Sequence, residues 1–253
     1  PVDVGREALL VLVNHRRAAR RVHAGVVALV AFCFPAANGS SQSNVSSHPD
    51  SGADAKQTGL PEPTGGTENT PRFEAKAPPM AVAPFDQTTA QAHQREWARY
   101  LKVPFEREVI LPERESISFV LVPPGEFLMG SSEEDHERFL EDAEAADDTF
   151  SLTVVNSEIP QHRVRITQPF YMAKYELTQE QWWAISGSSP SVFSGVNLPV
   201  ENVTWNETQA FIDELNRINA GSQLSFALPT EAQWEYACRA GTSSPWSFGD
   251  TVE

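Results

Sequence analysis

The sequence predicts an α+β domain with short strands, few helices and long loops. Residues 119–130 contain two short apolar runs around Pro123, Pro124 and Gly125, and residues 162–176 begin with an alternation of apolar and charged residues; both patterns are typical of strands. Three threonines, Thr178, Thr204 and Thr230, are each followed three residues later by Gln or Glu and then by apolar residues. This capping-box pattern predicts the start of a helix at each threonine.

Residues 1–37 have the pattern of a secretory signal. Four arginines between positions 16 and 21 precede an uncharged run at residues 24–34, and the small residues Ala36 and Ala37 follow. The run is too short to span a bilayer comfortably. We therefore expect export to an extracytoplasmic compartment, periplasmic or secreted. A buried helix and a translated upstream region are the alternatives.

Two further segments precede the main domain. Residues 38–88 are rich in Ser, Pro, Gly, Thr, Asn and Ala, and almost lack branched and aromatic apolar residues, so we expect a disordered linker. Residues 89–111 are predicted to form a lead-in helix and a connector. The helix pattern covers residues 87–101, with an apolar stripe that includes Trp97 and Tyr100, and Pro104 ends it.

The domain proper is expected at residues 112–253. Within it, Val164 and Ile166 alternate with Arg163 and Arg165, as in a half-buried strand. An acidic insertion at residues 131–158 lacks the spacing of an EF-hand calcium loop. Its charge favours a solvated, mobile loop.

The helix predicted within residues 228–241, LPTEAQWEYACRAG, is the best specified in the chain. Thr230 and Gln233 form its capping box. Trp234, Ala237 and Cys238 share one face, which we expect to be buried. Gly241 stands where a left-handed C-terminal cap is favoured.

The charge of the chain excludes some partners. Formal net charge is −15, and residues 112–253 contain 23 acidic but only 7 basic residues. Such a surface repels phosphate backbones and anionic lipid, so we expect no nucleic-acid partner and no membrane contact beyond export.

No catalytic, cofactor-binding or metal-binding residue is predicted. The sequence has no glycine-rich phosphate loop and no G-x-S-x-G nucleophile motif. Its histidines do not stand at metal-ligand spacing, and His93 is expected at the surface. Cys238 is expected to be a buried, inert thiol rather than a nucleophile. Four tryptophans could line a carbohydrate site but are more typical of a core at their positions. They are residues 182, 183, 205 and 234.

Four segments occur in a specific order: FVLVPPGEFLMGS (119–131), ITQPFYMAKYELTQEQW (166–182), LPVENVTW (198–205) and LPTEAQWEYACRAG (228–241). Together they resemble the formylglycine-generating, sulfatase-modifying-factor family. The lead-in at residues 90–106 is similar to extensions that precede such domains in bacterial members. The resemblance implies a C-type-lectin-like α+β fold.

The resemblance also implies an activity. Family members oxidise a cysteine of a sulfatase to formylglycine with molecular oxygen, and the aerobic enzymes hold copper with two cysteines in their C-terminal half. This sequence ends at SFGDTVE, and its cysteines are Cys33, within the signal-like segment, and Cys238. We therefore expect the N-terminal part of such a domain, with copper only in a complete aerobic member. The expected partner is an unfolded sulfatase polypeptide or another protein ligand. The alternative is a non-catalytic C-type-lectin-like binding module, and the residues leave open whether the full protein is an enzyme.

Overall fold

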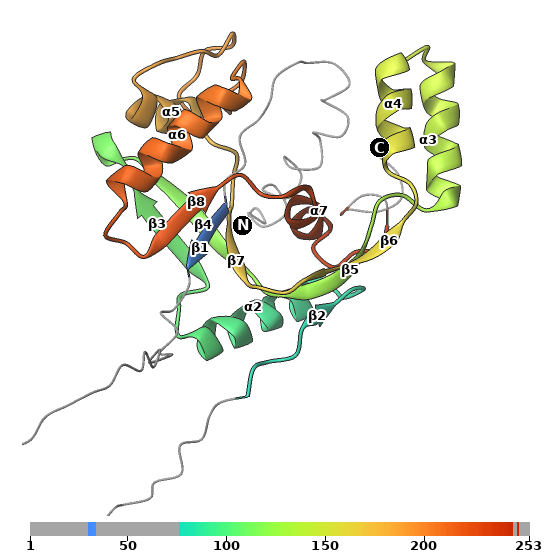
Figure 1. The fold of residues 1–253 in the computed structure, drawn as a ribbon, viewed down its shortest axis with the longest axis horizontal. Helices are drawn as coiled ribbons and strands as arrows, with labels where there is room; N and C mark the ends of the chain where they lie inside the picture. Colours follow the sequence, from blue (N-terminus) through green and yellow to red (C-terminus); the bar gives the residue numbers. More distant parts are fainter. Residues whose placement is uncertain (1–29, 34–75, 245–246, 248–253) are drawn as a thin grey trace, which may run out of the picture. The chain divides into compact units, whose positions relative to one another are not determined.

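Two β-sheets form the framework of the protein in a computed structural model that describes residues 30–33, 76–244 and 247 (Figure 1). The five-stranded sheet has the order β3-β4-β7-β1-β8, and every neighbouring pair is antiparallel. Its strands are β1 (Val30–Cys33), β3 (Glu106–Ile110), β4 (Ser116–Val122), β7 (Phe170–Ala173) and β8 (Leu224–Ala227). The three-stranded sheet has the order β2-β5-β6. Its strands are β2 (Ala81–Val82), β5 (Gly125–Met129) and β6 (His162–Ile166).

The strand predictions for residues 119–130 and 162–176 are confirmed. The first run forms β4 and β5 on either side of two prolines, and the second forms β6 and β7. In β6, Ile166 is buried while Arg163 and Arg165 are exposed, as the alternation predicts. Both arginines pair with Glu126 of the neighbouring strand β5, with N–O distances of 3.4 and 2.5 Å.

All three predicted capping boxes are present. In each, the threonine hydroxyl accepts a hydrogen bond from the backbone N–H three residues on, and the Gln or Glu side chain accepts one from the backbone of the threonine. These boxes begin α5 (Gln179–Ser186), α6 (Trp205–Ile218) and α7 (Glu231–Arg239). A short 3₁₀ turn also occurs at Pro112–Arg114.

The acidic insertion is helical, so the prediction of a mobile loop was wrong. It forms α3 (Glu133–Ala145) and α4 (Thr149–Ser157), which lie side by side (Figure 1). Ser132 and Asp148 cap the two helices through their side-chain oxygens. The acidic side chains in the first turn of α3 stabilise the helix, because they lie at the positive end of its dipole. Ala143 and Val155 are buried, so the pair has an apolar side that the charge pattern concealed.

The lead-in helix is confirmed as α2 (Gln87–Leu101). Trp97 and Ala98 are its buried residues, whereas Tyr100, predicted on the same stripe, is 37% exposed. The Trp97 indole N–H donates to the carbonyl of Pro79, and Ala81 in β2 is fully buried. The folded part therefore includes residues that the sequence assigns to the linker. Residues 38–75 of that linker, and residues 1–29 and 34–37 of the signal-like segment, lie outside the described residues.

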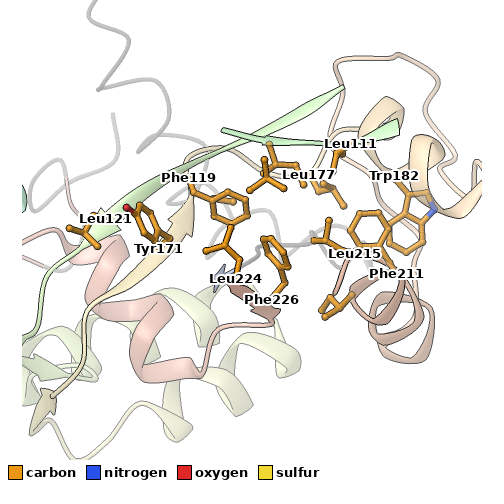
Figure 2. Close-up of a cluster of buried hydrophobic side chains, with 14 of the residues drawn as sticks. Leu111, Phe119, Leu121, Tyr171, Leu177, Trp182, Phe211, Leu215, Leu224 and Phe226 are labelled. Atoms are coloured by element: carbon orange, nitrogen blue, oxygen red, sulfur yellow. The ribbon is translucent and has the colours of Figure 1, made fainter. Parts of the chain in front are cut away.

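The main core lies where α5 and α6 pack against the five-stranded sheet (Figure 2). Trp182 of α5 stacks on Phe211 of α6, with ring centroids 4.9 Å apart. Asn216 of α6 donates to the carbonyl of Phe226 at 3.0 Å and accepts from its N–H at 2.8 Å, which joins α6 to β8. Burying each large apolar side chain contributes about 1.5–3 kcal/mol.

The face that α7 buries differs from the prediction. Glu235, Tyr236 and Arg239 are buried, whereas Trp234, Ala237 and Cys238 are only half-buried. Tyr236 packs against Phe127 of β5 with ring centroids 5.4 Å apart, and burial raises the pKa of its hydroxyl. The prediction favoured the apolar positions, because sequence alone does not show that two charged residues are paired.

A buried ion pair on α7 holds this helix to β5. The Arg239 guanidinium lies 2.7 Å from the Glu235 carboxylate, and its Nη2 also donates to the carbonyl of Gly130 at 2.7 Å. The N–H of Gly130 donates to Glu235 at 2.9 Å. We call these three residues the 130–235–239 network. Gly130 has a φ of +91°, and a Cβ there would lie 2.3 Å from the carbonyl oxygen of Glu158, so this position requires glycine.

Gly241 makes a second close approach just beyond α7. The helix ends with Ala240 in the left-handed region, and Gly241 follows with a φ of +92°. A Cβ on Gly241 would lie 2.2 Å from the ring of Phe85. The Phe85 N–H donates to the carbonyl of Gly241 at 2.9 Å. This contact fixes the chain leaving α7 against the segment that enters α2.

Replacing Arg239 with Met should destabilise the full chain by about 3–5 kcal/mol, because the Glu235 carboxylate would remain buried without its cation. Urea denaturation of the wild type and variant measures the difference. The matched control is Arg217→Met, since Arg217 forms a similar two-bond pair with Glu214 on the exposed face of α6. We expect little change there. Equal effects of the two substitutions would contradict a special role for the network.

Gly241→Ala should lower the free energy of unfolding more than Gly187→Ala. Both glycines have positive φ, but a Cβ at Gly187 meets nothing within 4 Å, whereas at Gly241 it meets Phe85. Backbone strain alone costs roughly 1–2 kcal/mol at each position. The excess at Gly241 should shrink when the test is repeated in a Phe85→Ala background. An unchanged excess would show that Phe85 is not its cause.

Candidate functional site

A hollow of about 850 Å³ lies beside the end of α7. Three parts of the chain line it: the entry to α2, the first turns of α3 and the segment after α7. The lining residues are Pro84, Phe85, Asp86, Glu134, Asp135, Arg138, Gly241, Thr242, Ser243 and Ser244. Sequence reasoning did not find this hollow, because its three parts are far apart along the chain.

The segment at 241–244 is held in place from α7. Arg239 donates from Nη1 to the carbonyl of Ser244 at 3.3 Å. The N–H of Thr242 donates to the carbonyl of Arg239 at 2.9 Å, and the Thr242 hydroxyl donates to the same oxygen at 2.8 Å. The 130–235–239 network thus also determines where one wall of the hollow lies.

Two of the three carboxylates that line the hollow, those of Asp86 and Asp135, have structural bonds. Asp86 accepts from the N–H of Thr89 at 2.8 Å, and the side-chain and backbone hydrogen bonds from Thr89 lower the pKa of this carboxyl. Asp135 pairs with Arg138 at 2.9 Å and accepts from the Ser132 hydroxyl at 2.8 Å. The lining residues include no Cys and no His. Helix capping by Asp86 and ion pairing by Asp135 explain these two carboxylates better than a role in acid–base catalysis does.

A second feature is an apolar surface on the segment from α5 to α6. Six large apolar side chains there are 44–71% exposed. They are Trp183, Val192, Phe193, Val196, Leu198 and Trp205, and we call them the 183–205 surface. Aromatic side chains are enriched at protein interfaces, and exposed apolar side chains that form a contiguous patch mark interaction sites. The 183–205 surface is therefore a stronger candidate than the hollow for contact with a polypeptide.

Hydrogen bonds from two side chains hold the backbone of this segment. Gln179 donates to the carbonyl of Phe193 at 2.7 Å and accepts from the N–H of Gly195 at 3.2 Å. Glu201 accepts from the N–H groups of Val192 and Phe193, the latter at 3.0 Å. The segment therefore exposes its apolar side chains while its backbone is tied to the domain.

The tryptophan prediction is correct only in part. Trp182 is 2% exposed and lies in the core, as expected (Figure 2). Trp183 and Trp205 are 50% and 68% exposed, so their assignment to the core was wrong, and Trp234 is half-buried. Adjacent residues on a helix point in directions about 100° apart, so Trp182 and Trp183 cannot both face the core.

Cys238 and the described histidines are not among the residues that line the hollow or form the 183–205 surface, although His93 packs against the lining residue Phe85 and His136 lies next to Asp135 on α3. His162 is exposed and contacts the carbonyl of Pro160 at 3.0 Å. His93, expected at the surface, is half-buried with its ring edge against Phe85. Cys238 is half-buried on α7 rather than fully buried. Histidines 15, 23 and 48 lie outside the described residues.

The described residues do not supply a metal site. Within these residues, no three or more His, Cys, Asp or Glu side chains are grouped so that they could hold a metal ion. The copper site that the family resemblance implies needs two cysteines, and Cys238 is the one cysteine whose side chain the structure describes, so this part of the chain does not fit that site. Of the helices in the described ranges, none has the length and apolarity needed to cross a membrane.

Comparison with known proteins gives a family and two relatives. The model of the sulfatase-modifying factor enzyme 1-like domain matches residues 107–253, more than half of the chain. Chaperone protein LppX of Paenibacillus barcinonensis is 33% identical over 106 residues, covering 30% of this chain and 38% of the relative. The formylglycine-generating enzyme of Mus musculus is 33% identical over 113 residues, covering 43% of this chain and 27% of the relative. The chain thus spans well under half the length of either relative.

No solved structure matches the chain significantly. The family match includes all four segments on which the sequence resemblance rests, and the observed framework is α+β with short strands. The chain therefore belongs to the sulfatase-modifying factor enzyme 1-like family, and its fold is the C-type-lectin-like fold expected for that family.

Proposed function

We propose that this domain binds an unfolded sulfatase polypeptide as part of a formylglycine-generating type of protein. The observation that carries the proposal is the 183–205 surface, in a domain of the sulfatase-modifying family. An unfolded polypeptide offers apolar side chains that such a surface can cover, and aromatic residues dominate the binding energy of many interfaces. Export to an extracytoplasmic compartment, where such a substrate would be met, is part of the same proposal.

We propose oxidation of the bound cysteine only on condition that the full protein carries a copper-binding cysteine pair. Oxidising a substrate thiol to an aldehyde with molecular oxygen would take the copper and cysteine pair that the resemblance implies. Cys238 is half-buried on α7, between buried residues of that helix that anchor it to β5. In this proposal the described residues contribute substrate binding and the scaffold, and oxidation by the whole protein depends on whether it carries that cysteine pair.

A second candidate is a non-catalytic binding module. The match to a protein named as a chaperone favours it, because that name implies handling of a polypeptide without chemistry. Both candidates use the 183–205 surface. They differ in whether a cysteine-containing sulfatase sequence is preferred and in whether the full protein oxidises it.

The binding proposal predicts that the full chain binds a fluorescent, unfolded, cysteine-containing sulfatase peptide in an anisotropy titration. Trp205→Ser and Phe193→Ser should each weaken binding by about tenfold, since truncating an interface aromatic costs roughly 1–2 kcal/mol or more. The matched control is Ile110→Ser on β3, which is 67% exposed but distant in sequence from this surface. Binding that is absent, or equally weakened by all three substitutions, would contradict the proposal.

The same peptide separates the two candidates. With copper and oxygen added, we expect the chain to bind the peptide without forming an aldehyde, as intact-mass spectrometry would show. Aldehyde formation would place the oxidising centre within these residues and overturn that part of the proposal. Equal affinity for an unrelated unfolded peptide of similar apolarity would favour the binding module over the sulfatase-specific reading.

A further inference from the structure

The chain between α5 and α6 is held in two different ways along its length (Figure 1). Residues 187–204 are all described and contain no helix or strand. Their later part is tied by main-chain bonds, such as the one from the N–H of Gln179 to the carbonyl of Leu198 at 2.9 Å. Within the described part of the chain, no hydrogen bond between main-chain groups ties residues 188–194 to another segment. The conformation of residues 188–194 therefore depends on side chains.

One carboxylate makes the main contribution to holding the exposed side of this part. Val192 and Phe193 belong both to residues 188–194 and to the 183–205 surface. Their N–H groups donate to the same atom, Oε1 of Glu201, and the bond from Phe193 is 3.0 Å long. Residues 175–216 contain no Lys, Arg or His, so these main-chain donors meet the charge of Glu201 in place of a neighbouring cation. Hydrogen bonds to an ionised acceptor are roughly twice as strong as neutral ones.

We propose that Glu201 is a positioning residue of the 183–205 surface. Its carboxylate holds Val192 and Phe193 in the conformation that presents their side chains to an unfolded polypeptide. The inference rests on the proposed binding function and adds to it a residue that acts on the main chain of the surface rather than on the partner. Ordering a loop at an interface lowers affinity, so a loop that is ordered beforehand binds more tightly. Removing the carboxylate should weaken binding although every apolar side chain of the surface remains.

The variant Glu201→Ala keeps several other bonds of this segment. The Ser191 hydroxyl accepts from the N–H of Glu201 at 3.1 Å and donates to its carbonyl at 3.3 Å, and both bonds use only the main chain of Glu201. The Asn202 side chain donates to the carbonyl of Pro190 at 3.0 Å. The substitution should therefore act locally, on the two N–H groups that the carboxylate binds.

Amide hydrogen exchange of the full chain tests the positioning without any partner. In Glu201→Ala, the amides of Val192 and Phe193 should exchange faster by about tenfold or more, since each loses a charged acceptor. Glu201→Gln should keep most of their protection, because its side-chain carbonyl can still accept both bonds. Asp213→Ala is the matched control, since Asp213 is an exposed carboxylate of α6 within the same cation-free stretch. Unchanged exchange in Glu201→Ala would overturn the proposal whether or not a peptide binds.

The anisotropy titration then tests the consequence for binding. Glu201→Ala should weaken binding of the fluorescent, unfolded sulfatase peptide by about fivefold, while Glu201→Gln and Asp213→Ala stay within about twofold of the wild type. Equal losses in Glu201→Ala and Glu201→Gln would show attraction by the charge instead of positioning, and would overturn the proposal. A wild type that binds no peptide contradicts the proposed function alone, since exchange decides separately whether Glu201 holds the segment.

A double-mutant cycle separates positioning from a general loss of structure. If Glu201 acts through the segment that carries Phe193, the loss from Glu201→Ala should shrink to about twofold in a Phe193→Ser background and persist in a Trp205→Ser background. Urea denaturation should give nearly the same midpoint for Glu201→Ala and the wild type. A loss of equal size in both backgrounds, or a fall in stability as large as the fall in affinity, would show a merely structural role and overturn the proposal.

Discussion

The buried contact among Gly130, Glu235 and Arg239 is the constraint on which the second half of the fold depends. A carboxylate and a guanidinium are costly to bury, and here each is satisfied by the other and by the backbone of Gly130. Gly130 directly follows β5, and the two charged residues lie on α7. A single cluster therefore joins a strand to a helix more than a hundred residues later.

The network's contribution is positional more than energetic. Well-packed apolar residues can replace buried ion pairs with little loss of stability, so the pair is weak support for stability as such. It does fix which face of α7 meets β5, because only one rotation of the helix brings Glu235 and Arg239 to Gly130. The same guanidinium reaches the carbonyl of Ser244, so the helix rotation also sets one wall of the hollow.

How far the sequence predicts the structure depends on how local each interaction is. The three capping boxes involve residues three apart, and each formed as predicted. The face of α7 was mispredicted because Gly130, whose backbone both Glu235 and Arg239 contact, lies more than a hundred residues earlier in the chain. The helices of the acidic insertion were not predicted, because its many acidic residues were taken as the sign of a solvated loop. The helix-capping residues Ser132 and Asp148 were the local signal for helices. The hollow and the position of β1 depend on contacts between distant segments, which no local pattern indicates.

The contrast between Trp182 and Trp183 separates scaffold from surface within one helix. Trp182 stacks on Phe211 and fixes α5 against α6, so its neighbour must point away from that core. Gln179 and Glu201 then hold the following segment by its backbone, which leaves the side chains of Val192 and Phe193 outside. An apolar segment that is hydrogen-bonded in place has lost much of its conformational entropy before any partner arrives. Such preorganisation would lower the entropic cost of binding the flexible polypeptide that we propose as the partner of this segment.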